Sequence, residues 1–439
     1  PDDVPGFDRA VEVLGRAVAL AARVWGRGND GDAADLGATA LDAYVQDMLD
    51  ESARHARAGD LDRGAGLLDG ALAELDRREA ALRERRRRAR HALLTAALQQ
   101  DLGRRDAPAA ARRIEALAAL ERPDHPTAAP FFREQEAALL DAGLQQRHLL
   151  SLAVVERLLR RRLQALQAAG AGGADERREA GLSLARVLNR LGANDPLSTA
   201  PEEARRLCRE ALATTARAAH EHEWAALQHE LAIALARIGE RAGDPAALDE
   251  ASACCRLALQ VRTRERAPPG WVDSMALLAQ VERRAGTLAA DATRLETAVQ
   301  VGRECLRGLS RAESGRQWAN LQSTVAGALG LLARSEGSIA RRHEAVAAYR
   351  AALGEMSLEQ TPREWGALQC NLGIELAALG ESEPSPAGTE SLQAAVDAYR
   401  AALRVLSIEA SPAGWAIVQH NLGGALRLLG EREPGTQSL

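Results

Sequence analysis

The sequence predicts an all-α protein built as an α-solenoid of stacked antiparallel helix hairpins. Tryptophan recurs through the second half of the chain in steps of 47, 47, 47 and 50 residues by subtraction, and a fixed period of about 20–50 residues indicates a solenoid. Aromatic residues make up only 3% of the chain, and Ala and Leu supply most of the apolar content, which suits closely packed helices. The recurring tryptophans are Trp224, Trp271, Trp318, Trp365 and Trp415.

A first helix is predicted to start at each of these tryptophans. Positions 4, 7, 8 and 11 after it share its helical face, and an aliphatic residue always stands seven positions on: Leu231, Leu278, Val325, Leu372 and Leu422. Thr361-Pro362-Arg363-Glu364 combines a capping box with a proline in the first turn, which is typical of a helix start. In four repeats glycine follows the tryptophan by 15 positions, and we interpret it as a helix stop: Gly239, Gly286, Gly380 and Gly430.

A second helix is predicted in each repeat. A leucine column marks it, always 12 residues before the next tryptophan: Leu212, Leu259, Leu306, Leu353 and Leu403. The register also extends one repeat toward the N-terminus, because Leu184, Ala185 and Leu188 stand 47 residues before Leu231, Ala232 and Leu235. Arg177 occupies the tryptophan position of that repeat.

These repeats resemble the tetratricopeptide repeat family. Asn371-Leu372-Gly373 with Leu376 is similar to the Leu-Gly core of the family's first helix, and Ala345, Tyr349 and Ala352 follow its small-x3-aromatic-x2-Ala pattern. The resemblance is to a bacterial Trp-x3-Gln-x-Asn-Leu-Gly variant, common in long signalling or defence proteins, and it covers residues 175–439. It implies a right-handed superhelix with a concave binding surface. Because the standard unit has about 34 residues, we expect about seven extra residues between the two helices and about six before the next repeat.

Residues 1–169 are predicted to form a separate helical region with degenerate hairpins of the same kind. Residues 56–75 and 98–120 each resemble a hairpin turn followed by a helix, and one long helix is predicted over residues 131–169. The run from Ala169 to Ala174 is rich in glycine and is the predicted boundary. The array of 47–50-residue repeats at 175–439 forms the second region.

The composition argues against several functions. A net charge of −5 disfavours general nucleic-acid binding. All 56 basic residues are arginine, which excludes Schiff-base and P-loop lysine chemistry. No run of roughly 18 uncharged apolar residues predicts a membrane span. Five cysteines without C-x-x-C spacing argue against disulfides or zinc, so we expect free thiols in a reducing cytoplasm, with no metal and no cofactor.

Three local motifs have both a functional and a structural interpretation, and we favour the structural one. The tryptophans could be a stacking ladder for bases, but packing of each indole against the preceding second helix is expected. His220, His222 and His229 could bind a metal, but residues two apart point to different helix faces. The arginine-rich run 83–90 could contact phosphate or an acidic partner, but acidic residues one or two turns upstream offer i,i+4 pairs.

Two further motifs are treated in the same way. Cys254 and Cys255 could act in redox chemistry, but Cys255 lies in the column that holds Tyr349 and Tyr399, so core packing is expected. Residues 26–32 (Gly-Arg-Gly-Asn-Asp-Gly-Asp) could cradle phosphate or calcium. They match neither the dinucleotide-binding nor the EF-hand pattern, so a connector is expected.

The concave groove is the predicted binding site, because stacked hairpins place their first helices along its wall. The one or two positions before the Leu column are expected to face the groove: His229, Glu230, Ser323, Thr324, Cys370, Asn371, His420 and Asn421. An asparagine there offers a donor and an acceptor to a peptide backbone, with bonding to a neighbouring helix as the alternative. Arg283 and Arg427, one turn on, are expected to meet a carboxylate. The lysine clamp of chaperone-binding relatives is absent.

We therefore expect a protein-interaction scaffold that binds a peptide or partner domain. An enzyme is not expected, since no nucleophile–base pair or metal-ligand spacing occurs. The alternative is a sensor or regulatory arm of a larger bacterial signalling or defence effector. Residues 435–439 repeat residues 388–392 with one change, at a point where a second helix should begin. We accordingly expect a fragment, with any catalytic domain elsewhere in the full-length chain.

Overall fold

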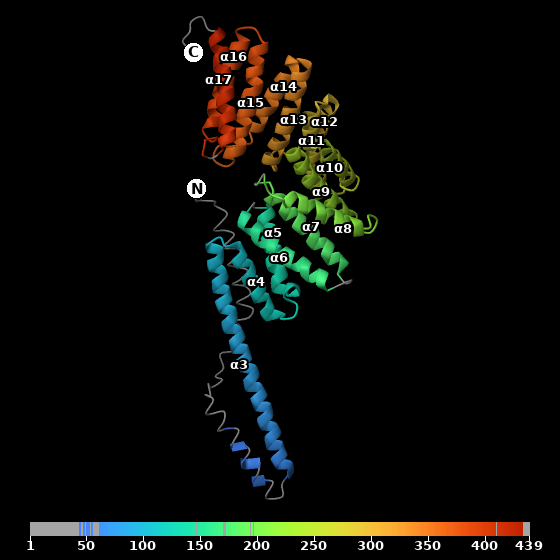
Figure 1. The fold of residues 1–439 in the computed structure, drawn as a ribbon, viewed down its shortest axis with the longest axis vertical. Helices are drawn as coiled ribbons and strands as arrows, with labels where there is room; N and C mark the ends of the chain where they lie inside the picture. The colour runs from blue at the N-terminus through green and yellow to red at the C-terminus, as the bar shows by residue number, and fades with distance from the viewer. Residues whose placement is uncertain are drawn as a thin grey trace. The chain divides into compact units, whose positions relative to one another are not determined.

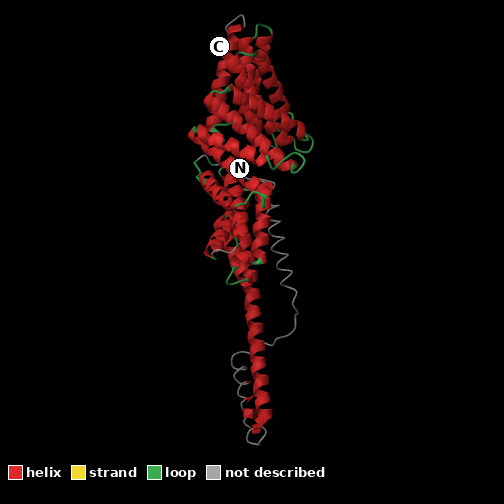
Figure 2. Ribbon diagram, turned by 90° about the vertical axis from the view of Figure 1, so that its right-hand side faces the viewer, coloured by secondary structure: helices red, strands yellow, loops and turns green. Residues whose placement is uncertain are grey.

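The structure is a computed structural model that describes residues 44, 47–48, 50–52, 54–55, 61–145, 148–169, 173–193, 195, 197–409 and 411–432. Within these ranges every regular element is a helix, and the predicted all-α fold is confirmed (Figure 2). The chain divides into two compact units, Pro1–Leu191 and Gly192–Leu439. Three predicted features lie outside the described residues: the segment at 26–32, the turn at 56–60 and the C-terminal residues 435–439.

Unit 2 is the solenoid that the repeat predicts. Each helix packs against the next along the chain, and successive first helices also touch one another (Figure 1). The first helices are α9 (Glu221–Ala242), α11 (Pro268–Ala289), α13 (Gly315–Glu336), α15 (Pro362–Ser382) and α17 (Pro412–Arg432). The second helices are α8 (Ala200–Thr214), α10 (Pro245–Leu259), α12 (Ala292–Gly308), α14 (Ile339–Leu353) and α16 (Ala387–Leu403).

Much of the extra length of the repeat lies in the first helix and not in a loop between the two helices, which corrects that expectation. The expected longer connection to the next repeat is present, as residues 260–267 between α10 and α11 show. The first helices α9, α11 and α13 each have 22 residues, and α10 begins after only Gly243 and Asp244. Asp244 caps α10, since its side chain accepts a hydrogen bond from the Ala246 amide at 2.9 Å. Two residues are therefore enough to reverse the chain direction between α9 and α10: Gly243, in the left-handed conformation (φ 62°), and Asp244, which caps α10.

The glycines read as helix stops have a different role, which is a second correction. Gly239, Gly286 and Gly380 lie inside their helices, before the helix ends. A Cβ on Gly286 would lie 2.9 Å from Cγ of Leu295 on α12, and Gly239 and Leu248 stand in the same relation. Glycine at this column therefore lets a leucine of the second helix approach the backbone of the first, which fixes where the two helices cross.

Trp271 packs between repeats, as the structural interpretation expects, and Trp365 packs against the core of its own region. Trp271 is 9% exposed and shares a buried cluster with Cys305 of α12 and Leu259 of α10. The indole thus also contacts the following second helix, where a Cβ on Gly308 would lie 2.7 Å from its Cζ3. An arginine seven residues upstream covers the ring in three repeats, at centroid distances of 4.6, 5.9 and 4.8 Å: Arg217, Arg264 and Arg311.

Ion pairs also join each repeat to the next along the outer helices. Arg209 of α8 binds Glu250 of α10 at 2.7 Å, and Arg303 of α12 binds Glu344 of α14 at 2.5 Å. These side chains are about half exposed, so each pair contributes only about 0–1 kcal/mol. These two pairs share a spacing of 41 residues and add little to stability.

Unit 1 contains α3 (Leu61–Gly103), α4 (Ala107–Glu121), the short 3-10 helix η1 (Pro126–Ala128), α5 (Pro130–Gln145), α6 (Leu149–Ala168) and α7 (Ala174–Leu191). The single helix predicted over residues 131–169 is wrong, because α5 and α6 form a hairpin. His148 caps α6 by accepting from the Ser151 amide at 3.3 Å, and Gly143 lets Leu152 approach closely. Histidine is not a usual capping residue, so the break carried no recognisable signal.

The helix α7, which carries the most N-terminal copy of the repeat pattern, belongs to unit 1 because of its contacts. α7 packs on α5 and α6, whereas the predicted boundary at residues 169–174 precedes it. A buried ion pair contributes to this packing. Arg162 of α6, 2% exposed, donates to Glu136 of α5 at 2.6 Å and to Glu179 of α7 at 3.2 Å. Burial raises the pKa of Glu136 despite this arginine.

Candidate functional site

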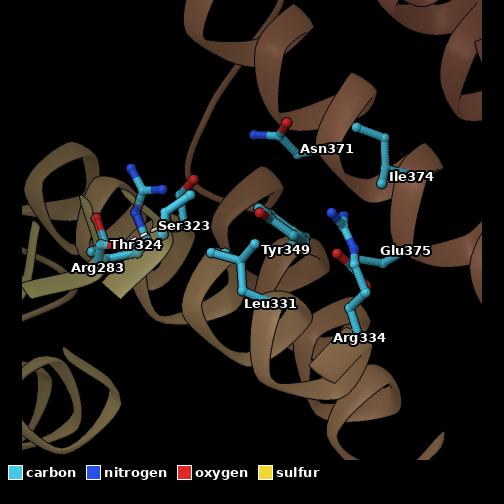
Figure 3. Close-up of a pocket in the computed structure, with 11 residues that line it drawn as sticks. Arg283, Ser323, Thr324, Leu331, Arg334, Tyr349, Asn371, Ile374 and Glu375 are labelled. Atoms are coloured by element: carbon cyan, nitrogen blue, oxygen red, sulfur yellow. Dashed lines mark hydrogen bonds between the residues drawn. The ribbon is translucent and has the colours of Figure 1, made fainter. Parts of the chain in front are cut away.

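A pocket of about 270 Å³ opens on the row of first helices in unit 2 (Figure 3). Three first helices and one second helix form its walls, so residues up to 92 positions apart by subtraction meet in it. Arg283 and Thr287 come from α11 and Tyr349 comes from α14. The remaining wall residues belong to α13 and α15: Ser323, Thr324, Gly327, Leu331, Arg334, Asn371, Ile374 and Glu375.

A glycine on α13 creates the hollow. The column of Gly327 holds Ile233, Gln280 and Ile374 in three other repeats and Gly424 in the last. A Cβ on Gly327 would lie 3.3 Å from the hydroxyl oxygen of Tyr349 and 3.4 Å from Cδ of Arg283. The missing side chain therefore lets the tyrosine ring reach the first-helix row from α14. Burial raises the pKa of Tyr349, so its hydroxyl stays protonated and able to donate.

Two arginines supply the positive charge of the pocket. Figure 3 shows Arg283 and Arg334 on opposite sides of Tyr349. Within the described residues, neither guanidinium forms an ion pair with a carboxylate, although many other arginines of unit 2 do. The column of Arg283 holds Ala236, Gly330 and Ala377 in three repeats and a second arginine, Arg427, in the last. The guanidiniums of Arg283 and Arg334 therefore keep their donors available for an anionic group.

A buried carboxylate forms the far side of the pocket. Glu375 is 6% exposed and pairs with Arg342 of α14, whose Nη1 lies 3.4 Å from its Oε2. Gly330 of α13 leaves the space that this carboxylate fills. Burial raises the pKa of Glu375, and the positive charges of Arg342 and Arg334 offset this only in part. Its charge is thus already committed to Arg342, and the pocket as a whole favours anions.

Polar side chains without charge line the rest of the pocket. Asn371 is half-buried, and the structure gives its amide no hydrogen bond to any described residue. This geometry does not show the alternative in which the asparagine bonds to a neighbouring helix. Thr324 donates its hydroxyl to the carbonyl of Asn320 at 3.0 Å, so it is less available than Ser323. In Figure 3 the Asn371 amide points toward the space above Tyr349.

Four of the predicted site residues thus meet in one pocket: Arg283, Ser323, Thr324 and Asn371. The others lie elsewhere. The His229 ring contacts the hydroxyl of the fully buried Ser274 at 3.2 Å, and Glu230 is only 9% exposed. Three further candidates are on α17, outside this pocket: His420, Asn421 and Arg427, the last of which pairs with Glu431.

One groove assignment is corrected. Cys370 does not face the groove, because it is 8% exposed and belongs to the apolar core around Tyr399 and Leu372. The position two residues before the Leu column therefore points into the core here, whereas Ser323 at the same column of α13 lines the pocket. The same column thus faces the core in one repeat and the pocket in another, so position relative to the Leu column does not by itself determine which side chains face the groove.

Sequence reasoning missed Tyr349, Arg334 and Glu375, although the repeat itself carries a signal for the last. The column of Glu375 otherwise holds small or apolar residues: Ala234, Val281, Ala328 and Ala425. Its partner Arg342 likewise stands in a column of Leu248, Leu295 and Leu392. Two complementary charges in two apolar columns indicate a contact. Tyr349 could not be recognised in this way, because its column already contains an aromatic residue at Tyr399.

The hollow continues toward α9. A second pocket of about 210 Å³ shares Arg283 and Thr287 with the first and extends to Glu240 and Leu288. At its edge Arg284 pairs with Glu240 at 2.9 Å. The two pockets together form a strip that crosses α9, α11, α13 and α15, which suits an extended ligand better than a compact one.

Other chemistries weighed from the sequence find no support in the described part of the chain. It holds no group of three or more His, Cys, Asp or Glu side chains placed to bind a metal. Burial raises the pKa of Cys254 to about 11 and that of Cys305 to about 12, so neither is a reactive thiolate. Among the described helices, none combines the length and apolarity needed to cross a bilayer.

No protein-family model matches this chain, and no curated protein matches it significantly. The chemistry of the pocket is therefore the basis for its interpretation.

Proposed function

We propose that this protein is an interaction scaffold that binds a peptide segment of a partner protein along its row of first helices, anchored in the pocket between α11, α13 and α15. The supporting observation is a local break in the repeat. Glu375 and Arg342 are the only charged residues in their otherwise apolar columns, and Glu375 lines the pocket while Arg342 pairs with its carboxylate. Departures from an otherwise consistent pattern gather at functional sites.

The pocket chemistry suggests how such a peptide would be held. Arg283 and Arg334 would bind an acidic side chain or a terminal carboxylate through charge-assisted hydrogen bonds. The Asn371 amide would bond to the peptide backbone, since it offers both a donor and an acceptor. Leu331 and Ile374 add an apolar edge. A volume of about 270 Å³ is small for a drug-sized ligand, which favours one anchored side chain with the rest of the peptide lying along the strip.

The resemblance to tetratricopeptide repeats supports the same proposal, because solenoids bind partners along extended concave surfaces. A scaffold without catalysis is proposed, since the described pocket offers no nucleophile beside a general base.

Two asparagines of the same column provide a matched test. Peptides that bind the full chain would first be selected from a random display library. A selected peptide would then be titrated calorimetrically into the wild type, Asn371→Ala and Asn421→Ala. Asn371 lines the pocket and Asn421 is on α17 outside it. We expect Asn371→Ala to weaken binding by about tenfold and Asn421→Ala to leave it unchanged.

Circular dichroism and the melting temperature of both variants would show that the fold is intact. Equal affinities for the two variants, or stronger loss in Asn421→Ala, would rule out the pocket as the anchor. Selected peptides that bind without an acidic residue and without a free C-terminal carboxylate would rule out the arginine pair as the recognition element.

A further inference from the structure

The helix α3 extends far beyond the helices on which it packs. It has 43 residues, about 65 Å of helix. Its contact with α4 lies at its C-terminal end, where Leu98 and Leu102 are buried and Asp101 pairs with Arg113 at 3.2 Å. Figure 1 shows most of α3 running past α4. The middle of the helix must therefore be stable in water or be covered by something else.

Ion pairs within the helix involve several of its charged residues. Glu74 binds Arg78 at 2.8 Å, Glu79 binds Arg83 at 2.5 Å and Glu84 binds Arg88 at 3.1 Å, all with i,i+4 spacing. Each such pair contributes a few tenths of a kcal/mol to an isolated helix. The basic run at 83–90 is in this respect a solvated face, as the sequence suggested.

The ion pairs do not account for three exposed leucines. Leu72, Leu82 and Leu93 are 60%, 48% and 73% exposed, and the aromatic ring of Tyr44, which stacks against Arg78 at 4.9 Å, leaves them uncovered. They obey a heptad register. Leu72 and Leu93 are three heptads apart at position a, and Leu82 falls at position d with a column of apolar residues: Leu68, Leu75, Ala89 and Ala96.

We propose that α3 pairs with α3 of a second copy of this chain as an antiparallel coiled coil centred near Leu82. The leucines support the two-fold arrangement, because Leu72 precedes Leu82 by ten residues and Leu93 follows it by eleven. An antiparallel pair centred near there brings Leu72 of one copy within about one helical turn of Leu93 of the other, because position a packs against position d of the partner in such a pair. This inference is independent of the proposed function of unit 2.

Charge selects the antiparallel orientation over the parallel one. The only charged residues at position a are Glu79 and Arg86, and the antiparallel pair brings Glu79 of each copy near Arg86 of the other. Residues 83–90 carry six arginines and one glutamate, a formal charge of +5, whereas residues 69–79 carry four acids and two arginines, a formal charge of −2. A parallel pair would place the +5 segments side by side, which like-charge repulsion disfavours.

Sedimentation equilibrium of the full chain tests the pairing. We expect a dimer for the wild type and a monomer for Leu72→Glu/Leu93→Glu, with the dissociation constant raised about a hundredfold or more, because a buried glutamate loses its solvation. Leu197→Glu is the matched control, since Leu197 is a 90% exposed leucine of unit 2, and it should leave the dimer intact. Unchanged helical circular dichroism would show that α3 remains folded in each variant.

A charge exchange tests the orientation. Arg86→Glu alone places two glutamates together in the antiparallel pair and should weaken the dimer about tenfold. Adding Glu79→Arg restores opposite charges and should recover the wild-type dissociation constant. A wild-type monomer through the micromolar range, or a dimer that survives Leu72→Glu/Leu93→Glu, overturns the pairing. A dimer in which the second exchange gives no recovery overturns the antiparallel orientation.

Discussion

The hairpins α11–α12 and α13–α14 follow one register and bury different chemistry at equivalent positions. In the first, Leu295 packs on Gly286. In the second, the same two columns hold Arg342 and Ala333, and Arg342 pairs with Glu375 of the next repeat. The first helices of the two hairpins, α11 and α13, nevertheless both have 22 residues. The hairpin geometry thus tolerates a charged contact at one column, and that tolerance lets a pocket form without a change of fold.

The largest expected change in stability comes from replacing Arg342 of the second hairpin by the leucine that the first hairpin has at this column. Arg342→Leu leaves Glu375 buried without its partner and should lower the free energy of unfolding by about 3–5 kcal/mol. Arg342→Leu/Glu375→Ala restores both column types and should recover most of that loss. Urea denaturation followed by circular dichroism measures both changes. If the double variant were less stable than either single one, the charged contact would not be a simple replacement of an apolar one.

A smaller effect should separate two glycines of one column. A Cβ on Gly373 would lie 2.6 Å from the ring of Tyr399, whereas nothing lies within 4 Å of a Cβ on Gly423 of α17. We expect Gly373→Ala to cost about 1–3 kcal/mol and Gly423→Ala to stabilise by about 0.5–1 kcal/mol, because alanine is the better helix former. Thermal melting of the two variants compares them directly, and equal shifts would contradict the described packing of α16 on α15.

The arginines over the tryptophans should show a graded and weaker effect. Arg217 lies 4.6 Å from the Trp224 ring and Arg264 lies 5.9 Å from the Trp271 ring. Arg217→Ala should therefore cost about 0.5–1 kcal/mol and Arg264→Ala less. Urea unfolding monitored by tryptophan fluorescence gives both values. A larger loss for Arg264→Ala would show that stacking is not what these arginines contribute.

The smallest effect concerns pH. Burial raises the pKa of Glu375 above its ordinary value of 4.5, so the folded chain binds this proton more tightly than the unfolded chain. Its favourable contribution is therefore fully present below pH 4.5 and is lost as pH rises through the folded-state pKa. Relative to Glu375→Gln, the wild type should lose stability as pH rises from acid to neutral. Parallel stability curves for the two proteins would contradict the raised pKa.

Much of the solenoid could be predicted because the residues that recur in each repeat are the buried residues of its helices. The Leu231 and Ala232 columns follow the helical period, and such periodicity survives in any all-α stack. What failed depended on contacts between helices. The sequence around Gly286 is typical of a helix stop, and only the structure shows that Leu295 packs against this glycine. The sequence near His148 contains no usual signal for the turn between α5 and α6.

The candidate site was predictable only where it used the first-helix columns. Arg283 and Asn371 could be placed from register alone, whereas Tyr349 reaches the pocket from a second helix through the gap left by Gly327. Such a contact depends on how two helices cross, which one sequence does not specify. The sequence does carry one signal for the site: at Arg342 and Glu375 a charged residue stands in a column that is apolar in the other repeats.

The central claim is that the pocket made by this break in the repeat is where the partner binds. Calorimetric titration of a selected peptide into Arg283→Ala/Arg334→Thr tests it most directly. This variant restores the residue types found at Ala236 and Thr287 and removes two guanidiniums that form no ion pair within the described residues. Affinity should fall by more than about tenfold while the melting temperature stays the same. Unchanged affinity in a folded variant would contradict the claim.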